Sequence, residues 1–170
     1  ISRGSLKYLA DTGRLDQVSR GVYTLPEVWE DEFVSIQERY KRGVFALDTA
    51  LFLHDLTDRT PHKFHMAFPY GYNTSSPKAA GILCSCKKEP YYSLGIALVD
   101  TPAGNTVRAY NAEKTLCEIL KPISHTDIQI ITDAFKRYAG RKDKNIPLLS
   151  EYAHQLRVEK RLRPYLEVLL

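Results

Sequence analysis

The order of strand-like and helix-like segments constrains the fold of this chain more than any other feature of its sequence. Between residues 62 and 110, short apolar segments are separated by Pro, Gly, Asn and Ser, which is typical of strands joined by turns. From Asn111 onward, apolar residues recur at helical spacing in four successive stripes. Strands gathered in one stretch and helices in the next indicate an α+β fold, with an antiparallel or mixed sheet and a helical C-terminal region. The strands are expected at 63–69, 81–87, 95–100 and 106–110, with a loop at 70–80.

Helices are expected on both sides of this strand-rich stretch. Before it, residues 27–42 have the spacing of an amphipathic helix, and Asp48 is expected to cap a second helix. His54 lies on that second helix, and we interpret it as a hydrogen-bonded core histidine and not as a catalytic base. After the strands, Asn111 is expected to cap the first of four helices, and Pro164 is compatible only with the beginning of the last one.

The first 26 residues predict a short helix followed by a β-hairpin. Residues 2–10 have an apolar stripe, and Gly13 is suited to end the helix because glycine readily adopts a left-handed conformation. Two short strands are expected at 15–19 and 22–25, with Arg20-Gly21 as the tight turn between them. A short polar helix and a basic-tipped hairpin form the second half of a winged helix-turn-helix, whose helix lies in the DNA major groove.

This pattern divides the chain into a partial winged helix-turn-helix at 1–26, comprising recognition helix and wing, and an α/β domain at 27–170. The helices that precede a recognition helix are missing from the sequence, which begins at Ile1, and we expect the natural protein to extend further. The solvated face of an ordinary surface helix is the alternative explanation for the same polar residues. The DNA-contacting candidates in the first part are Ser2, Arg3, Ser5, Lys7, Tyr8 and Arg20.

Charge is distributed unevenly along the chain. The net charge is +4, but residues 27–60 carry eight acidic against four basic side chains, so the basic excess lies toward the two ends. A polyanion-binding surface built from both ends is one interpretation, and a solvated face is the other. We expect the C-terminal basic clusters to contact DNA phosphates and, if the helices pack antiparallel, to share a surface with the hairpin. These clusters are Lys136, Arg137, Arg141, Lys142 and Lys144, and then Lys160 and Arg161.

The sequence offers little support for an enzyme or a metal protein. Three cysteines leave one unpaired in any disulfide framework, and the five histidines have no recognisable ligand spacing. We expect Cys84, Cys86 and Cys117 to pack as apolar side chains. Nucleotide-binding loops, nucleophile elbows and zinc-protease motifs are missing from the sequence.

One weak nuclease-like pattern needs separate comment. Asp100 is followed by Glu113-Lys114, but adjacent residues at the start of a helix project in different directions around it. We therefore expect no catalytic residues, no metal and no cofactor. The longest apolar runs have four residues and no signal peptide is visible, so we expect a cytoplasmic protein without a membrane segment.

Several motifs, taken in order, resemble the AbiEi family. These proteins are antitoxins and autorepressors of type IV toxin–antitoxin systems. The resemblance spans most of the chain; family members often have Arg where Lys114 stands and Asp where Glu118 stands. The motifs are Ser19-Arg20-Gly21-Val22-Tyr23 with Leu25-Pro26, Asp48-Thr49-Ala50-Leu51-Phe52-Leu53-His54-Asp55-Leu56, Tyr110-Asn111-Ala112-Glu113-Lys114-Thr115-Leu116, and Tyr165-Leu166-Glu167-Val168-Leu169-Leu170.

The resemblance implies a function as well as a fold. It implies an N-terminal winged helix that binds the operator of its own operon and a C-terminal α/β domain that supplies antitoxin activity. The implied partner is a nucleotidyltransferase-like toxin, which the antitoxin opposes without forming a stable complex. A DNA-binding transcriptional regulator without a toxin partner is the alternative, and an enzyme would require a convergent pocket of acids or histidines.

Overall fold

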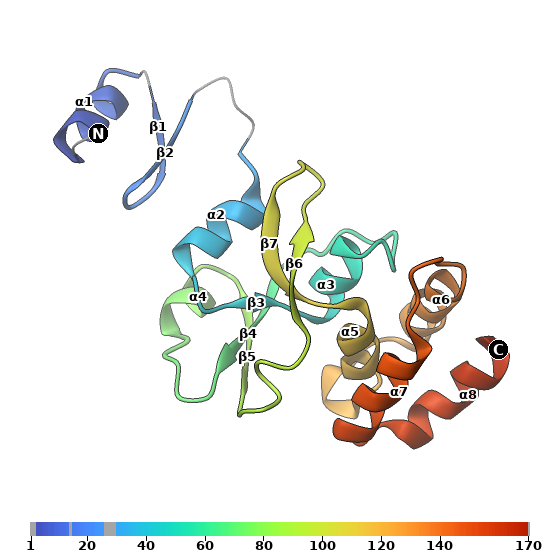
Figure 1. The fold of residues 1–170 in the computed structure, drawn as a ribbon. Helices are drawn as coiled ribbons and strands as arrows, with labels where there is room; N and C mark the ends of the chain where they lie inside the picture. Colours follow the sequence, from blue (N-terminus) through green and yellow to red (C-terminus); the bar gives the residue numbers. More distant parts are fainter. Residues whose placement is uncertain (1–2, 14, 26–29, 170) are drawn as a thin grey trace.

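The chain folds into an α+β structure in which a mixed sheet lies between a small N-terminal unit and a group of C-terminal helices (Figure 1). This is a computed structural model, and it describes residues 3–13, 15–25 and 30–169. The α+β class and the helical C-terminal region expected from the sequence are confirmed. None of the helices in these described ranges has the length and apolar character needed to span a bilayer.

Five strands form the central sheet, in the order β5-β4-β3-β7-β6. The pairs β4–β5 and β3–β7 are parallel, while β3–β4 and β6–β7 are antiparallel, so the sheet is mixed. Four of these strands begin and end within two residues of the predicted ranges. The strands are β3 (Val44–Phe45), β4 (His65–Pro69), β5 (Leu83–Lys87), β6 (Ile96–Asp100) and β7 (Thr106–Tyr110).

The sheet is covered on both faces because its central residues alternate between them. On one face, Phe45 packs against Phe33 of helix α2 (Glu32–Arg39), with the ring centroids 5.5 Å apart. On the other, Val44 belongs to a buried cluster that includes Tyr92, from the segment between β5 and β6. The short helix α4 (Ser75–Ala79) lies within the residues expected to form a loop, so that expectation is wrong in part.

Two other helix boundaries also differ from the predicted ones. Helix α2 begins at Glu32 and not at residue 27, because Asp31 caps it by accepting a hydrogen bond from the Phe33 amide. The same carboxylate accepts a hydrogen bond from Asn105 at 3.0 Å, which ties the start of α2 to the β6–β7 turn. In helix α3 (Leu47–Leu53), Ala46 occupies the N-cap position without a side-chain hydrogen bond, and Asp48, the expected cap, lies inside the first turn.

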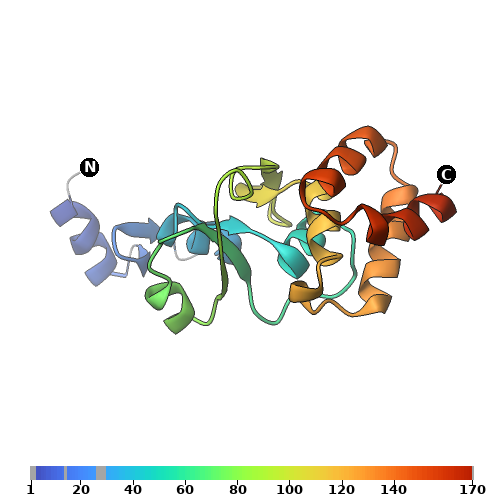
Figure 2. The same cartoon turned by 90° about the horizontal axis from the view of Figure 1, so that it is seen from below.

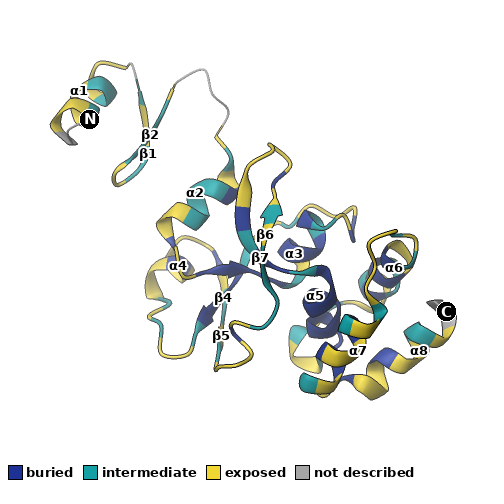
Figure 3. Cartoon of the chain, viewed as in Figure 1, coloured by how far each residue is buried: buried dark blue, intermediate teal, exposed yellow. Residues whose placement is uncertain are grey.

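The C-terminal helices enclose a second core, which contains Leu116, Phe135, Leu149 and Leu162 (Figure 3). The helices are α5 (Ala112–Ile119), a short 3₁₀ turn η1 (Pro122–Ser124), α6 (Ile128–Ala139), α7 (Ile146–Gln155) and α8 (Glu159–Leu169). Asn111 caps α5 as predicted, since its side chain accepts a hydrogen bond from the Lys114 amide at 2.9 Å.

Pro164 lies in the middle of α8, so the expectation that it stands near the helix start is wrong. The proline ring removes one backbone hydrogen bond from the helix. Packing on both sides of it offsets this loss, because Leu162 is buried and the Tyr165 ring stacks on Phe135 with the centroids 4.4 Å apart.

Candidate nucleic-acid interface

Helix α1 (Arg3–Asp11) is amphipathic and presents its polar face to solvent. Leu6, Leu9 and Ala10 are half-buried, whereas Lys7 and Tyr8 are exposed. Ser5, another candidate, is also exposed. Ser2 lies outside the described residues, and of Arg3 only the backbone is described. Three of the six N-terminal candidates, Ser5, Lys7 and Tyr8, are therefore exposed on one helix.

A β-hairpin follows α1, as the sequence predicts. Gly13 ends the helix in the left-handed conformation, at φ 71°, and strands β1 (Asp16–Ser19) and β2 (Val22–Thr24) then pair antiparallel. The tip consists of Arg20 and Gly21, and Gly21 also has a positive φ, of 84°, which the tight turn requires. Arg20 is exposed there. The hairpin thus carries its one arginine at the point farthest from the strands' free ends.

The small N-terminal unit is only loosely packed. Among residues 4–13 and 15–25 none is fully buried, and the buried core of the described chain begins at Phe33 (Figure 3). Strand β1 contacts α2, which connects this unit to the rest of the molecule. A helix followed by a hairpin is the element order of the second half of a winged helix-turn-helix.

The first C-terminal cluster divides into partnered and unpartnered side chains. Arg141 binds Asp143 through two hydrogen bonds, of 2.8 and 2.7 Å, and donates a third to the His54 carbonyl at 2.9 Å. Arg137 pairs with Asp133 at 2.8 Å, and Lys144 donates to the carbonyl of Ala139.

The remaining members of this cluster, Lys136 and Lys142, are exposed, and no described carboxylate lies within 4.0 Å of either ammonium group. Intramolecular contacts therefore account for Arg137, Arg141 and Lys144, and leave two lysines available to a polyanion. The hydrogen bond to Asp143 raises the pKa of Arg141, and the same bond lowers the pKa of Asp143 to about 2.

The second C-terminal cluster lies at the start of α8. Lys160 and Arg161 are exposed in its first turn and line a hollow of about 480 Å³ together with Arg157 and His154. Arg157 ends the preceding turn in a left-handed conformation, at φ 58°. His154 pairs with Glu159, so the hollow contains one carboxylate beside three basic side chains.

The structure does not bring the two ends of the chain together. Helix α1 and the hairpin lie at one end of the molecule, and α6, α7 and α8 lie at the other, in both views (Figures 1 and 2). The expectation that the C-terminal clusters share a surface with the hairpin is therefore wrong for a single chain. The sheet separates the two ends, since β3 to β7 occupy the middle of the molecule.

Glu113 and Lys114 point in different directions, as expected from their adjacent positions on a helix. Glu113 accepts a hydrogen bond from the Tyr138 hydroxyl at 2.7 Å. Lys114 is fully buried and donates to the carbonyls of Tyr91 and Leu94, at 2.7 and 2.9 Å. Burial lowers its pKa to about 8. Both side chains therefore hold helix α5 against neighbouring segments.

The remaining histidine and cysteine predictions have mixed outcomes. His54 is hydrogen-bonded, with Nε2 2.8 Å from the Tyr110 carbonyl, as the sequence predicts, but it is only half-buried and directly follows helix α3. Cys117 is buried as expected, but Cys84 is only half-buried and Cys86 is exposed. The expectation of apolar packing fails for Cys86 because β5 is an edge strand of the sheet.

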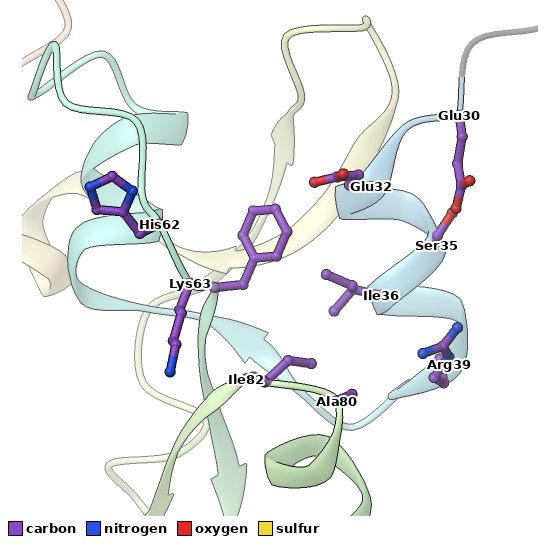
Figure 4. Close-up of a pocket in the computed structure, with 11 residues that line it drawn as sticks. Glu30, Glu32, Ser35, Ile36, Arg39, His62, Lys63, Ala80 and Ile82 are labelled. Carbon is purple, nitrogen blue, oxygen red and sulfur yellow. The ribbon is translucent and has the colours of Figure 1, made fainter.

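A cavity of about 420 Å³ lies between α2 and the segments that flank β4 and β5 (Figure 4). Glu32 and Arg39 line it from α2, and His62 and Lys63 lie across from them. Its acidic and basic side chains are balanced, which does not favour a polyanion. A second cavity, of about 650 Å³, has a different lining that contains Lys87, Lys88 and Lys121.

The sequence reasoning missed Lys87. This lysine is half-buried and binds Glu118 across 31 residues of sequence, with Nζ and Oε2 3.0 Å apart. Its place at the end of the predicted strand 81–87 was the local signal.

Comparison with known proteins supports the fold alone. No protein-family model matches the sequence, and no curated protein matches it. The structure is similar to the crystal structure of the RV2827C protein from Mycobacterium tuberculosis, with a TM-score of 0.55 and 14% sequence identity. The similarity covers 96% of this chain and 68% of that one.

Proposed function

We propose that this protein is a DNA-binding autorepressor and the antitoxin of a type IV toxin–antitoxin system. The observation that carries the DNA-binding part is the solvent-facing array of Lys7, Tyr8 and Arg20 on a helix and the hairpin that follows it. The helix would enter the major groove of operator DNA, and Arg20 would contact a phosphate beside it.

The antitoxin part rests on the resemblance of the sequence motifs to the AbiEi family. In this proposal the α/β domain opposes a nucleotidyltransferase-like toxin without forming a stable complex with it, and it acts without catalysis of its own. The buried roles of Glu113 and Lys114 agree with a structural use of these motif residues.

Operator binding is tested with the full chain and DNA from upstream of its own operon. Lys7→Ala and Arg20→Ala should each weaken binding; loss of a phosphate contact should reduce the salt slope by about one, and loss of a base contact should cost about 1–3 kcal/mol at one position. Lys41→Ala is the matched control, because Lys41 is exposed in the turn after α2 and outside the proposed interface. Fluorescence anisotropy titrations at several salt concentrations measure both quantities.

Equal affinity and salt slope for both variants and the parent would contradict the proposed interface. Binding by the parent without any rescue of cells from the adjacent toxin would favour the alternative, a regulator without a toxin partner.

A further inference from the structure

The cavity of about 650 Å³ lies where the edge strand β5 faces the end of α5. Leu47 at the start of α3 and Ile123 of η1 complete its wall. Its volume is in the range of cavities that bind small molecules, which is about 300–1,000 Å³. The DNA-contacting candidates do not line it.

Positive charge dominates this cavity. Lys87, Lys88 and Lys121 line it together with one carboxylate, that of Glu118. Glu118 is already engaged by Lys87 at 3.0 Å and, from behind the wall, by the buried Lys114 at 3.4 Å. No carboxylate of the described residues lies within 4.0 Å of the ammonium groups of Lys88 or Lys121. An anionic ligand would supply the missing negative charge.

Flat and apolar side chains lie beside these lysines. The Nζ atom of Lys121 is 5.8 Å from the centre of the Tyr91 ring, and Tyr91 is exposed at the cavity wall. Ile123, which also lines the cavity, is 82% exposed and offers an apolar surface. A ligand with an aromatic ring next to its anionic group would cover both Tyr91 and Ile123.

Two features of the wall depart from the usual pattern in proteins. The Nε2 atom of His65 is buried and has no hydrogen-bond partner among the described residues, although buried polar atoms are nearly always paired. Leu47 has a left-handed backbone, at φ 49°, which is costly for a residue with a Cβ atom. Such strained positions cluster at ligand sites.

We propose that this cavity binds a nucleoside phosphate, with the phosphate at the lysines of the lining and the base against Tyr91 and Ile123. A single phosphate held by two lysines and a ring held by an aromatic face match the lining in charge and shape. A concave site of this size suits a mononucleotide better than the backbone of duplex DNA. The inference is independent of the proposed operator binding, which uses other residues.

Isothermal titration calorimetry of the full chain tests this site. The probes are the four nucleoside 5′-monophosphates, ATP, inorganic phosphate and a ten-nucleotide single strand. The double variant Lys88→Gln/Lys121→Gln should lower the affinity for the preferred nucleotide at least about tenfold, because charge-assisted hydrogen bonds are lost. Lys41→Gln/Lys63→Gln removes the same charge from exposed positions outside this cavity and should bind like the parent.

Each alternative outcome is decisive. Saturable nucleotide binding that is lost only in the cavity variant, with unchanged circular dichroism and melting temperature, supports the proposal. Inorganic phosphate binding as tightly as any nucleotide overturns the assignment of a nucleoside, and so does binding of the single strand alone. No saturable binding of any probe by the parent overturns the site. Operator binding measured on the same variants reports separately on the proposed DNA-binding function.

Discussion

The ammonium group of Lys114 has no exposed surface; it donates hydrogen bonds to two backbone carbonyls and lies 3.4 Å from the Glu118 carboxylate. The two carbonyls, of Tyr91 and Leu94, lie in the segment that precedes β6, so the lysine holds this segment against α5. Gly95 follows directly, and a Cβ atom there would lie 2.8 Å from the Lys114 Cβ. The pair Glu113-Lys114, which resembles part of a nuclease motif in the sequence, therefore holds packed segments together in the structure.

At the same scale, His65 should make the stability of the fold sensitive to acid. Burial, and secondarily the charge of Lys87, lowers its pKa from 6.5 to about 4. As the pH falls from 6.5 to 4, the unfolded chain takes up a proton on this imidazole that the folded chain does not. The free energy of unfolding should therefore fall by about 3 kcal/mol across this window through His65 alone.

His65→Gln should flatten this pH dependence, as measured by urea unfolding between pH 4 and 7. His62→Gln is the control, since His62 is exposed three residues earlier in the same segment. The same pH dependence in His65→Gln as in the parent would show that His65 does not titrate differently in the folded chain.

At the scale of elements, α6 and the turn that follows it carry two kinds of basic residue. Some are held by contacts within the protein, and others are exposed and could bind DNA phosphates. Arg141 connects this turn to the carbonyl after α3, so its replacement would disturb packing as well as charge. Lys136 and Lys142 are exposed, so replacing them tests DNA binding without disturbing the packing.

We expect Lys136→Glu/Lys142→Glu to weaken binding to operator and random DNA alike and to reduce the salt slope by about two, since two phosphate contacts would be lost. Lys41→Glu/Lys63→Glu carries the same charge change elsewhere and serves as the reference. If the two double variants bind DNA with equal affinity and salt slope, α6 presents only a solvated face.

At the scale of the whole molecule, the buried residues lie from Phe33 onward, and the N-terminal unit contacts this body through β1 and α2. We therefore expect a fragment of residues 27–170 to fold alone, because it keeps all three buried clusters. In cells it should rescue growth from the toxin but fail to repress a reporter under the operon promoter.

Circular dichroism and urea unfolding establish that the fragment is folded before these assays are compared. A folded fragment that gives no rescue, beside a full chain that does, would contradict the division of functions between the two parts.

The sequence by itself determined the elements whose causes are local. The caps and turns at Gly13, Gly21 and Asn111, and four of the five strands of the central sheet, depend on residues only a few positions apart. Only the tertiary structure decided the two-residue strand β3, because its partners β4 and β7, which are distant in sequence, hold it in place.

The tertiary structure also decided which charges meet. The contact of Lys87 with Glu118, and the separation of the two basic ends by the sheet, depend on strand order and helix packing. Periodicity reports which face of an element is apolar, but it carries no information about the element that will cover that face. For this reason the N-terminal candidates could be chosen from the sequence, whereas the lysine-lined cavity could not.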